Sequence, residues 1–332
     1  MTHVQYGLIY DFRNPPPWRR PWETLYADLL QQIETAEHLG FDAIWLTEHH
    51  FAADGYLPSL FPVATAIASR TTKLRIGTNA LLAALHHPLR VAEDAAVTDI
   101  ISHGRLDLGL TLGFRAIEYQ RFGLPFDLGS RVARLQMVVE ALQQAYSDRT
   151  AYAVQPPPLQ QPHPPLYVGA NSRAALQALA PLGLPLLLIG GKDKLALYRE
   201  AQRAAGLDPV AVGAPIQSLG MFLYVAQDRQ TAWEMVRPYV RYLAEQDRFW
   251  SGKTGPVTDD GLQRLGIFGS PEDVAAKIVQ RLRDVQPRQV CFFANPPGMP
   301  VEVATASLQL FATEVRARVA ASLEESDTGT PV

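Results

Sequence analysis

The stretch that decides the fold is Ile44-Trp45-Leu46-Thr47-Glu48-His49-His50-Phe51. It begins as an apolar run, typical of a strand buried on both faces, and ends abruptly on a carboxylate and two imidazoles. In a barrel of alternating strands and helices, the side chains that do chemistry lie at the carboxyl ends of the strands. If the chain forms such a barrel, Glu48, His49 and His50 lie at the mouth of its active site.

Short apolar runs alternate with segments of helical periodicity along the whole chain. The predicted strands cover residues 4–10, 41–47, 74–82, 106–112, 166–169, 185–189, 216–226 and 289–293. The predicted helices cover residues 24–39, 58–69, 88–102, 130–146, 172–182, 192–205, 230–246 and 301–321, and another begins at Ser270-Pro271-Glu272-Asp273. This strict alternation predicts an α/β protein of the (β/α)8 TIM-barrel type and not an open doubly wound sheet.

We expect one domain over residues 1–324 and a polar, disordered tail at 325–332. The 332 residues exceed a minimal barrel by roughly 80. This surplus falls in predicted loops after strands, at 12–23, 114–129 and 247–269, which are insertions at the C-terminal face. Trp18, Trp22, Phe51, Phe249 and Trp250 gather there and either line an apolar substrate pocket or pack as small satellite cores.

Composition narrows the class of protein. With 47% hydrophobic and 19% charged residues, the chain is typical of a soluble globular protein with a large core. A net charge of −3 gives no reason to expect nucleic acid or a membrane surface as partner. The single cysteine, Cys291, excludes an internal disulfide. Neither a signal peptide nor an apolar run long enough to span a bilayer is visible, so we expect a cytoplasmic protein.

The Glu48-His49-His50 run has three possible meanings. Histidine and glutamate are good zinc or iron ligands, but adjacent histidines at a strand end point to opposite faces and rarely reach one ion. We therefore expect no metal. A purely structural pair of histidines is the second possibility. An acid–base or hydrogen-bonding role in an active site is the third, and the imidazole pKa near neutrality favours it.

Three other segments bring small or polar residues to the ends of predicted strands. Leu166-Tyr167-Val168-Gly169-Ala170-Asn171-Ser172-Arg173 runs from a strand into a helix and predicts either an anion site or an ordinary turn capped by Asn171 or Ser172. Asn79 and Ala80 end a strand with residues small enough for a flat ring to approach, or for tight packing in the barrel wall. Thr111 and Gly113 end a glycine-rich strand. No dinucleotide fingerprint or phosphate-binding P-loop motif occurs.

Taken together, these segments resemble the bacterial luciferase-like flavin-dependent monooxygenases, and the order of the motifs is close to that of the luciferase α subunit. The most specific pieces are Gly40-Phe41-Asp42-Ala43-Ile44-Trp45 leading into the Glu48-His49-His50-Phe51 run, and His87-Pro88-Leu89-Arg90. Ser102-His103-Gly104-Arg105, Phe122-Gly123 and Leu166-Tyr167-Val168-Gly169 follow.

The resemblance implies roles for individual residues. His49 would act in acid–base chemistry beside FMN, with Glu48 and His50 orienting or tuning it. A non-proline cis peptide against the flavin ring maps to Asn79–Ala80, and the flavin phosphate maps to Ser172 with the backbone of Asn171 and Arg173, next to Gly169. The family often has an arginine at the position of Leu112, so Arg115 or Arg173 would have to replace it. Thr111 stands where the family has a reactive cysteine.

The resemblance also implies a reaction and its partners. The chain would take reduced FMN from a separate NAD(P)H:flavin reductase and use O2 to oxygenate a small, apolar organic substrate. Two alternatives remain: an oxidoreductase of the same fold that uses the deazaflavin F420, and a non-catalytic subunit comparable to the luciferase β subunit. A homodimer is the family expectation, and the helices predicted at 58–69 and 88–102 are candidates for its interface.

Overall fold

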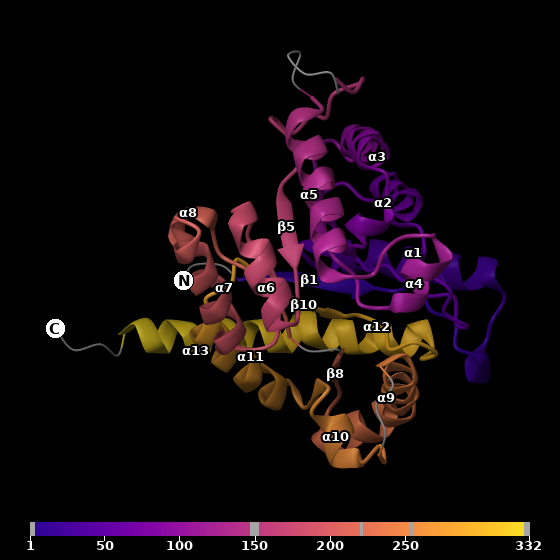
Figure 1. The fold of residues 1–332 in the computed structure, drawn as a ribbon. Coiled ribbons are helices and arrows are strands. Elements are labelled where there is room, and N and C mark those ends of the chain that lie inside the picture. Colours follow the sequence, from indigo (N-terminus) through magenta and orange to yellow (C-terminus); the bar gives the residue numbers. More distant parts are fainter. Residues whose placement is uncertain (1–3, 147–152, 220–221, 252–254, 329–332) are drawn as a thin grey trace.

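The computed structural model, which describes residues 4–146, 153–219, 222–251 and 255–328, contains a closed barrel of eight strands (Figure 1). In order around the barrel these are β1 (Gln5–Tyr10), β2 (Ala43–Leu46), β3 (Arg75–Leu81), β4 (Leu106–Thr111), β5 (Leu166–Gly169), β6 (Leu186–Ile189), β7 (Ile216–Ser218) and β10 (Gln289–Phe293). Every neighbouring pair is parallel. The predicted TIM barrel is therefore confirmed.

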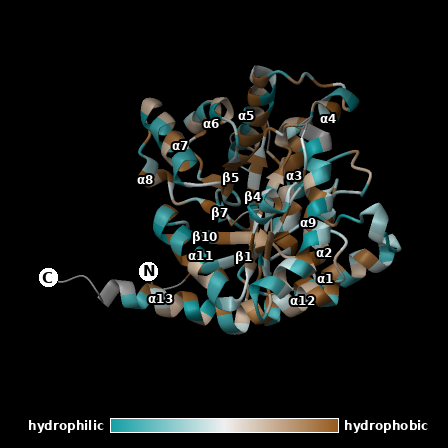
Figure 2. Ribbon diagram, turned by 90° about the horizontal axis from the view of Figure 1, so that it is seen from below, coloured by the Kyte–Doolittle hydropathy of each residue, from teal (hydrophilic) through white to brown (hydrophobic). Residues whose placement is uncertain are grey.

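Helices surround the barrel. They are α1 (Trp22–His38), α2 (Leu60–Ala68), α3 (Pro88–Ile101), α4 (Ala116–Arg121), α5 (Leu128–Gln144), α6 (Arg173–Leu179), α7 (Lys192–Ala204), α8 (Pro209–Val212), α9 (Arg229–Ser251), α10 (Asp259–Gln263), α11 (Pro271–Val285), α12 (Val301–Leu310) and α13 (Arg316–Thr328). Figure 2 shows mostly apolar strands at the centre and polar residues on the outward faces of the helices. This is the arrangement expected when each helix buries one apolar stripe against the sheet.

One indole fills much of the barrel interior. Trp45 is 1% exposed, and its Nε1 donates a 2.6 Å hydrogen bond to Gln289 Oε1. Glycines make room for the ring, because a Cβ at Gly7 would lie 2.9 Å from it and a Cβ at Gly77 would lie 2.3 Å from it. Trp45 thus belongs to the floor beneath the residues that follow β2.

The predicted seventh strand, 216–226, is wrong in its second half. Only β7 belongs to the barrel, whereas β8 (Phe222–Val225) pairs in parallel with β9 (Gly266–Gly269) in a separate two-stranded sheet. Phe222, Tyr224 and Phe268 form a second apolar core with residues of α9. The elements β8, α9 and α10 lie near the bottom of Figure 1. An apolar run does not reveal which strand it will pair with, and that is why the sequence did not separate the two.

The predicted loop at 247–269 is also wrong, because it contains the end of α9, the whole of α10 and β9. The loop at 12–23 carries a short 3-10 helix, Pro16–Trp18, and the loop at 114–129 carries α4. At the C-terminus, α13 extends to Thr328, so residues 325–328 of the predicted tail are helical, and 329–332 lie outside the described residues. The single domain stays a prediction. None of the helices within the described ranges is both long and apolar enough to cross a membrane.

Candidate active site

A cavity of about 350 Å³ opens at the carboxyl ends of β2 to β6. This volume lies toward the lower end of the range for ligand pockets. Nine of the predicted site residues line it: Glu48, His49, Asn79, Ala80, Thr111, Gly113, Gly169, Asn171 and Ser172. Three do not, namely His50, Arg115 and Arg173. The sequence motifs therefore converge on one cavity, as expected for the ends of neighbouring parallel strands.

The imidazole of His49 is held by a carboxylate that the sequence analysis missed. Glu118, on α4, is completely buried, and its Oε1 lies 2.9 Å from His49 Nδ1. The same oxygen accepts a 2.9 Å hydrogen bond from the backbone N–H of His50 and a 3.3 Å contact from Arg115 Nη1. A carboxylate at Nδ1 keeps the imidazole proton on that nitrogen, so Nε2 is the nitrogen that can exchange a proton with a ligand.

Nothing near His49 in the sequence points to Glu118, which lies 69 residues further along. The available signal was its position in an insertion that follows a barrel strand, where pocket-building residues gather. Only the folded insertion reveals the pairing. In the structure, α4 lies close enough to the end of β2 for Glu118 to contact His49 and His50.

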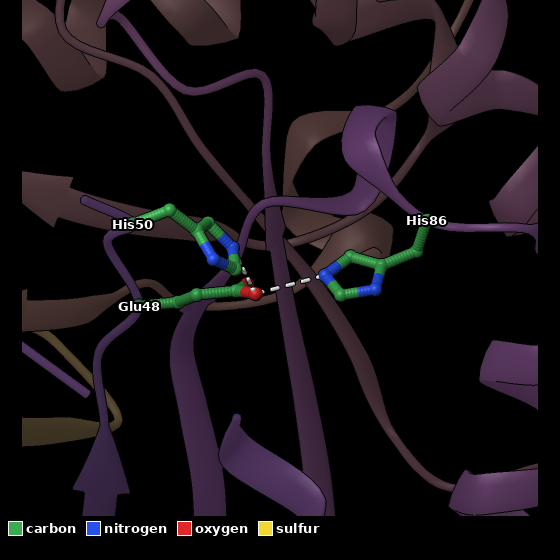
Figure 3. A group of neighbouring side chains, drawn as sticks. All are labelled: Glu48, His50 and His86. Atoms are coloured by element: carbon green, nitrogen blue, oxygen red, sulfur yellow. Dashed lines mark hydrogen bonds and ion pairs between the residues drawn. The ribbon is translucent and has the colours of Figure 1, made fainter. Parts of the chain in front are cut away.

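Glu48 lies between two imidazoles (Figure 3). Its Oε1 accepts hydrogen bonds from His50 Nε2 at 3.0 Å and from His86 Nε2 at 2.8 Å, and its Oε2 accepts one from the backbone N–H of Leu82 at 2.6 Å. Burial raises the pKa of Glu48, but the hydrogen bonds from both histidines and the backbone outweigh it and lower the pKa to about 2. Burial would lower the pKa of His86, but the hydrogen bond to Glu48 raises it. Glu48 is therefore an ionised anchor and not a proton donor.

Glu48, His50 and His86 are also the only group in the described part of the chain whose donor atoms lie close enough together to hold a metal ion. Both imidazole nitrogens, however, lie within hydrogen-bonding distance of one carboxylate oxygen. This arrangement satisfies all three groups without an ion, because an ionised carboxylate accepts several hydrogen bonds. We interpret the cluster as a hydrogen-bonded support for the strand end that carries His49.

Residues at the ends of β3, β4 and β5 form one wall of the cavity. The peptide bond Asn79–Ala80 is cis, as the family resemblance implied. The Asn79 amide Nδ2 lies 3.7 Å from the sulfur of Cys291 in the barrel interior, and burial raises the pKa of that thiol to about 12. Thr111 donates its hydroxyl hydrogen to the carbonyl of Gly169 at 2.8 Å. The main chain at the ends of β3, β4 and β5 therefore lines a surface that a planar ring can face.

The candidate phosphate turn, after β5, also lines the cavity. Ser172 Oγ caps α6 by accepting from the backbone N–H of Ala175 at 3.2 Å, so the capped-turn interpretation holds for Ser172. Neither predicted arginine reaches the cavity. Arg115 is buried and donates from Nη1 to the carbonyl of His50 at 2.9 Å, and Arg173 is exposed at the start of α6. The expectation that one of them replaces the arginine missing at Leu112 is not supported by their positions.

The structure instead brings Arg131 of α5 to the cavity. Its Nη1 donates to the carbonyl of Gly113 at 2.7 Å, and its guanidinium stacks 4.4 Å from the centre of the Phe126 ring. Its Nε is buried and has no hydrogen-bond partner among the described residues. A buried donor without an acceptor costs free energy, so an anionic ligand at this place would satisfy it. The sequence analysis missed Arg131, because a single arginine in a helix carries no signal of where it points.

Of the two alternatives for the aromatic loop residues, the structure does not support pocket lining for those whose side chains it describes. Trp18 packs against Tyr239 at 4.8 Å and Tyr242 at 5.9 Å between ring centres, and neither Trp18, Trp22 nor Phe51 lines the cavity. The side chains of Phe249 and Trp250 lie outside the described residues. The aromatic rings at the cavity are Phe114 and Phe126, from the 114–129 insertion. Satellite packing was thus the right alternative for Trp18.

Comparison with known proteins places the chain in a family. Residues 11–288 match the model of the luciferase-like monooxygenases, and the chain belongs to this family, as the sequence predicted. The oxygenase component of the flavin-dependent trigonelline monooxygenase of Acinetobacter baylyi is 34% identical over 159 residues, which are 44% of each chain. The alkanal monooxygenase alpha chain of Photorhabdus luminescens is 29% identical over 283 residues, 80% of this chain and 77% of that one.

The fold comparison agrees. The crystal structure of the monooxygenase RslO1 from Streptomyces bottropensis matches with a TM-score of 0.78 and 25% sequence identity, and the match covers 94% of this chain and 98% of that chain. The chain is thus similar along nearly its whole length to a solved monooxygenase.

Proposed function

We propose that this chain is an FMN-dependent monooxygenase that works as the oxygenase component of a two-component system. The observation that carries the proposal is one cavity that His49, Arg131 and the turn at Ser172 line together. The family and the relatives named above support the monooxygenase class. The absence of any nicotinamide fingerprint in the sequence supports a separate NAD(P)H:flavin reductase as electron source.

The cavity fits a flavin mononucleotide in two respects. Ala80, Thr111 and Gly169 line one wall with small side chains, which leave room for a tricyclic ring to approach the main chain. The Nε of Arg131, which has no partner among the described residues, and the exposed Ser172 and Asn171 suit a phosphate. The predicted phosphate role thus passes from Arg115 and Arg173 to Arg131, while Ser172 and Asn171 keep theirs.

Each side chain then has a task. Bound reduced FMN supplies the electrons that activate O2. His49 gives or takes a proton at Nε2 while Glu118 holds its ring, and Glu48 fixes the strand end through His50 and His86. Leu82, Leu112, Phe114, Leu187 and Ile189 make much of the wall apolar. Such a wall excludes water and favours a small apolar substrate.

The oligomeric state, the location in the cell and the two alternative functions remain predictions. A homodimer is expected, and the exposed Val97 and Ile101 on α3 favour the α2–α3 face as its interface. A cytoplasmic location is expected from the sequence. The two alternatives predict different ligands. An F420-dependent oxidoreductase would bind F420 in place of FMN, and a non-catalytic partner subunit would bind neither.

An anaerobic titration with reduced FMN and with reduced F420 tests the proposal. We expect FMN to bind more tightly, and we expect the bound reduced FMN to reoxidise with different kinetics from the free flavin after mixing with O2. His49→Ala should keep FMN binding and change the kinetics, whereas His38→Ala should change neither, because His38 is exposed at the end of α1 and does not line the cavity. Tighter binding of F420 would establish the first alternative. Binding of neither would establish the second.

A further inference from the structure

Lys194, in the first turn of α7, reaches back to the rim of the active-site cavity. Its ammonium Nζ donates to the carbonyl of Ile189 at 3.0 Å and to the side-chain oxygen of Asn171 at 3.1 Å. Both acceptors line the cavity. Asn171 belongs to the turn after β5, and Ile189 ends β6. Lys194 therefore joins two neighbouring strand ends at the side where we place the phosphate.

The local chain fixes the direction of the lysine stem. Gly190 has φ +122°, and a Cβ there would lie 3.2 Å from Lys194 Cδ, so the stem lies directly against the glycine. The carbonyl of Gly190 is held in turn by Gln217 Nε2 at 3.1 Å, from the buried side chain of a barrel strand. The sequence Gly190-Gly191-Lys192-Asp193-Lys194 thus makes a short bridge that points one ammonium at the cavity rim.

No described carboxylate forms an ion pair with Lys194. An ammonium has three hydrogens, and in the part of the chain that the structure describes Nζ has two acceptors, neither of them charged. Arg131 forms no ion pair with the described residues and donates to the carbonyl of Gly113, after β4. Its charge nevertheless adds to the hydrogen bonds from Ser130 that lower the pKa of Asp127. Two cations without a direct ion pair among the described residues thus stand at the cavity, with Lys194 bonded to Asn171 after β5 and Arg131 bonded to Gly113 after β4. Such an arrangement is complementary to a ligand anion.

We propose that Lys194 is a second phosphate contact, so that Lys194 and Arg131 together make the site discriminate FMN from riboflavin. The inference rests on the proposed function, because it takes the ligand to be a flavin. It assigns Lys194 to binding and selectivity. By contacting the phosphate through its third hydrogen while holding Asn171, Lys194 also fixes the turn that the phosphate meets.

Binding of two ligands that differ only in the phosphate tests this. We would measure dissociation constants for FMN and riboflavin by flavin fluorescence, at low and high salt, for the wild type, Lys194→Met, Lys194→Arg and Lys192→Met. Methionine keeps the stem against Gly190 and removes the charge. Lys192 is exposed on the same helix, so Lys192→Met controls for loss of a nearby positive charge.

We expect Lys194→Met to weaken FMN binding about tenfold, the low end for a charged hydrogen bond, and to leave riboflavin binding unchanged. Lys194→Arg should retain most of the affinity, Lys192→Met should have little effect, and the loss should shrink at high salt. Equal weakening of FMN and riboflavin, or no change in either, would overturn the role of Lys194 while FMN binding by the wild type leaves the proposed function standing. A wild type that binds no FMN would overturn both.

Discussion

Replacing Glu48 by glutamine should change the pH dependence of stability in a defined window. On folding, the pKa of Glu48 falls from its usual 4.5 to about 2. One pKa unit corresponds to about 1.4 kcal/mol, so this shift of roughly 2.5 units represents about 3 kcal/mol of preference for the ionised form. A carboxylate with a lowered pKa contributes stability that is present above its unfolded pKa and is lost as the pH falls toward its folded pKa.

The lowered pKa of Glu48 also predicts how much the free energy of unfolding changes over an experimentally accessible pH range. Between pH 5.5 and 3.5 the wild type should lose about 1.3 kcal/mol through Glu48 alone, because the unfolded chain takes up the proton first. Glu48→Gln should be less stable than the wild type at pH 5.5, and the gap should narrow by that amount at pH 3.5. On the alkaline side, the raised pKa of His86 acts with the opposite sign. Its contribution is complete below pH 6.5 and is lost as the pH rises through the folded pKa.

Denaturant unfolding at a series of pH values, followed by circular dichroism, measures both effects. Glu314→Gln is a matched control, since Glu314 is exposed on the surface and pairs with Arg318 at 3.2 Å. Its effect should stay below about 0.5 kcal/mol throughout, as for other exposed ion pairs. If the curves for Glu48→Gln and the wild type run parallel between pH 5.5 and 3.5, the carboxylate is not the ionised anchor that the two imidazoles imply.

Three further outcomes follow from the same contacts. Glu118→Gln should lower kcat by roughly 10- to 100-fold, as for other groups that orient a functional imidazole, and should shift the pH–rate profile; an unchanged profile would show that Glu118 does not act through His49. Arg131→Met should weaken FMN binding by at least about tenfold in an anaerobic titration and spare riboflavin, and equal loss of both ligands would contradict a phosphate contact. Gly77→Ala should destabilise the fold by about 1–3 kcal/mol, because its Cβ would lie 2.3 Å from the ring of Trp45. Thermal melting checks this against Gly169→Ala, where the nearest atom is 3.6 Å away, and equal melting temperatures would refute it.

Much of the site was predictable because the geometry of a barrel brings the ends of its strands together. In a closed parallel sheet, residues that end neighbouring strands meet at one rim, so a reader who locates the strands also locates their ends. This is why the Glu48-His49 pair, Asn79, Thr111 and Ser172, which come from four separate strand ends, were correctly expected to line one cavity. Local chain chemistry was enough for Ser172, which caps the helix that follows it.

The sequence analysis did not identify the functional side chains that lie outside the barrel strands, and the reason is the same for each. Glu118, Arg131 and Lys194 lie on helices outside the barrel. Arg131 lines the cavity, and Glu118 and Lys194 bind residues that line it, through contacts that no local pattern encodes. Arg115 shows the converse, because its place beside a strand end suggested a phosphate contact, yet its guanidinium is buried against His50 and Glu118. Proximity in sequence thus gives the region of such a side chain but not the direction in which it points.

The sequence by itself determined the barrel, the family and the strand-end residues of the cavity, since these depend on apolar periodicity and on motifs contiguous in the chain. Only the tertiary structure decided that His49 is held by Glu118, that Glu48 binds two imidazoles, and that β8 leaves the barrel to pair with β9. Those outcomes depend on contacts between residues distant in the chain. Their energies are settled by burial and hydrogen-bond geometry, which exist only once the helices have packed around the barrel.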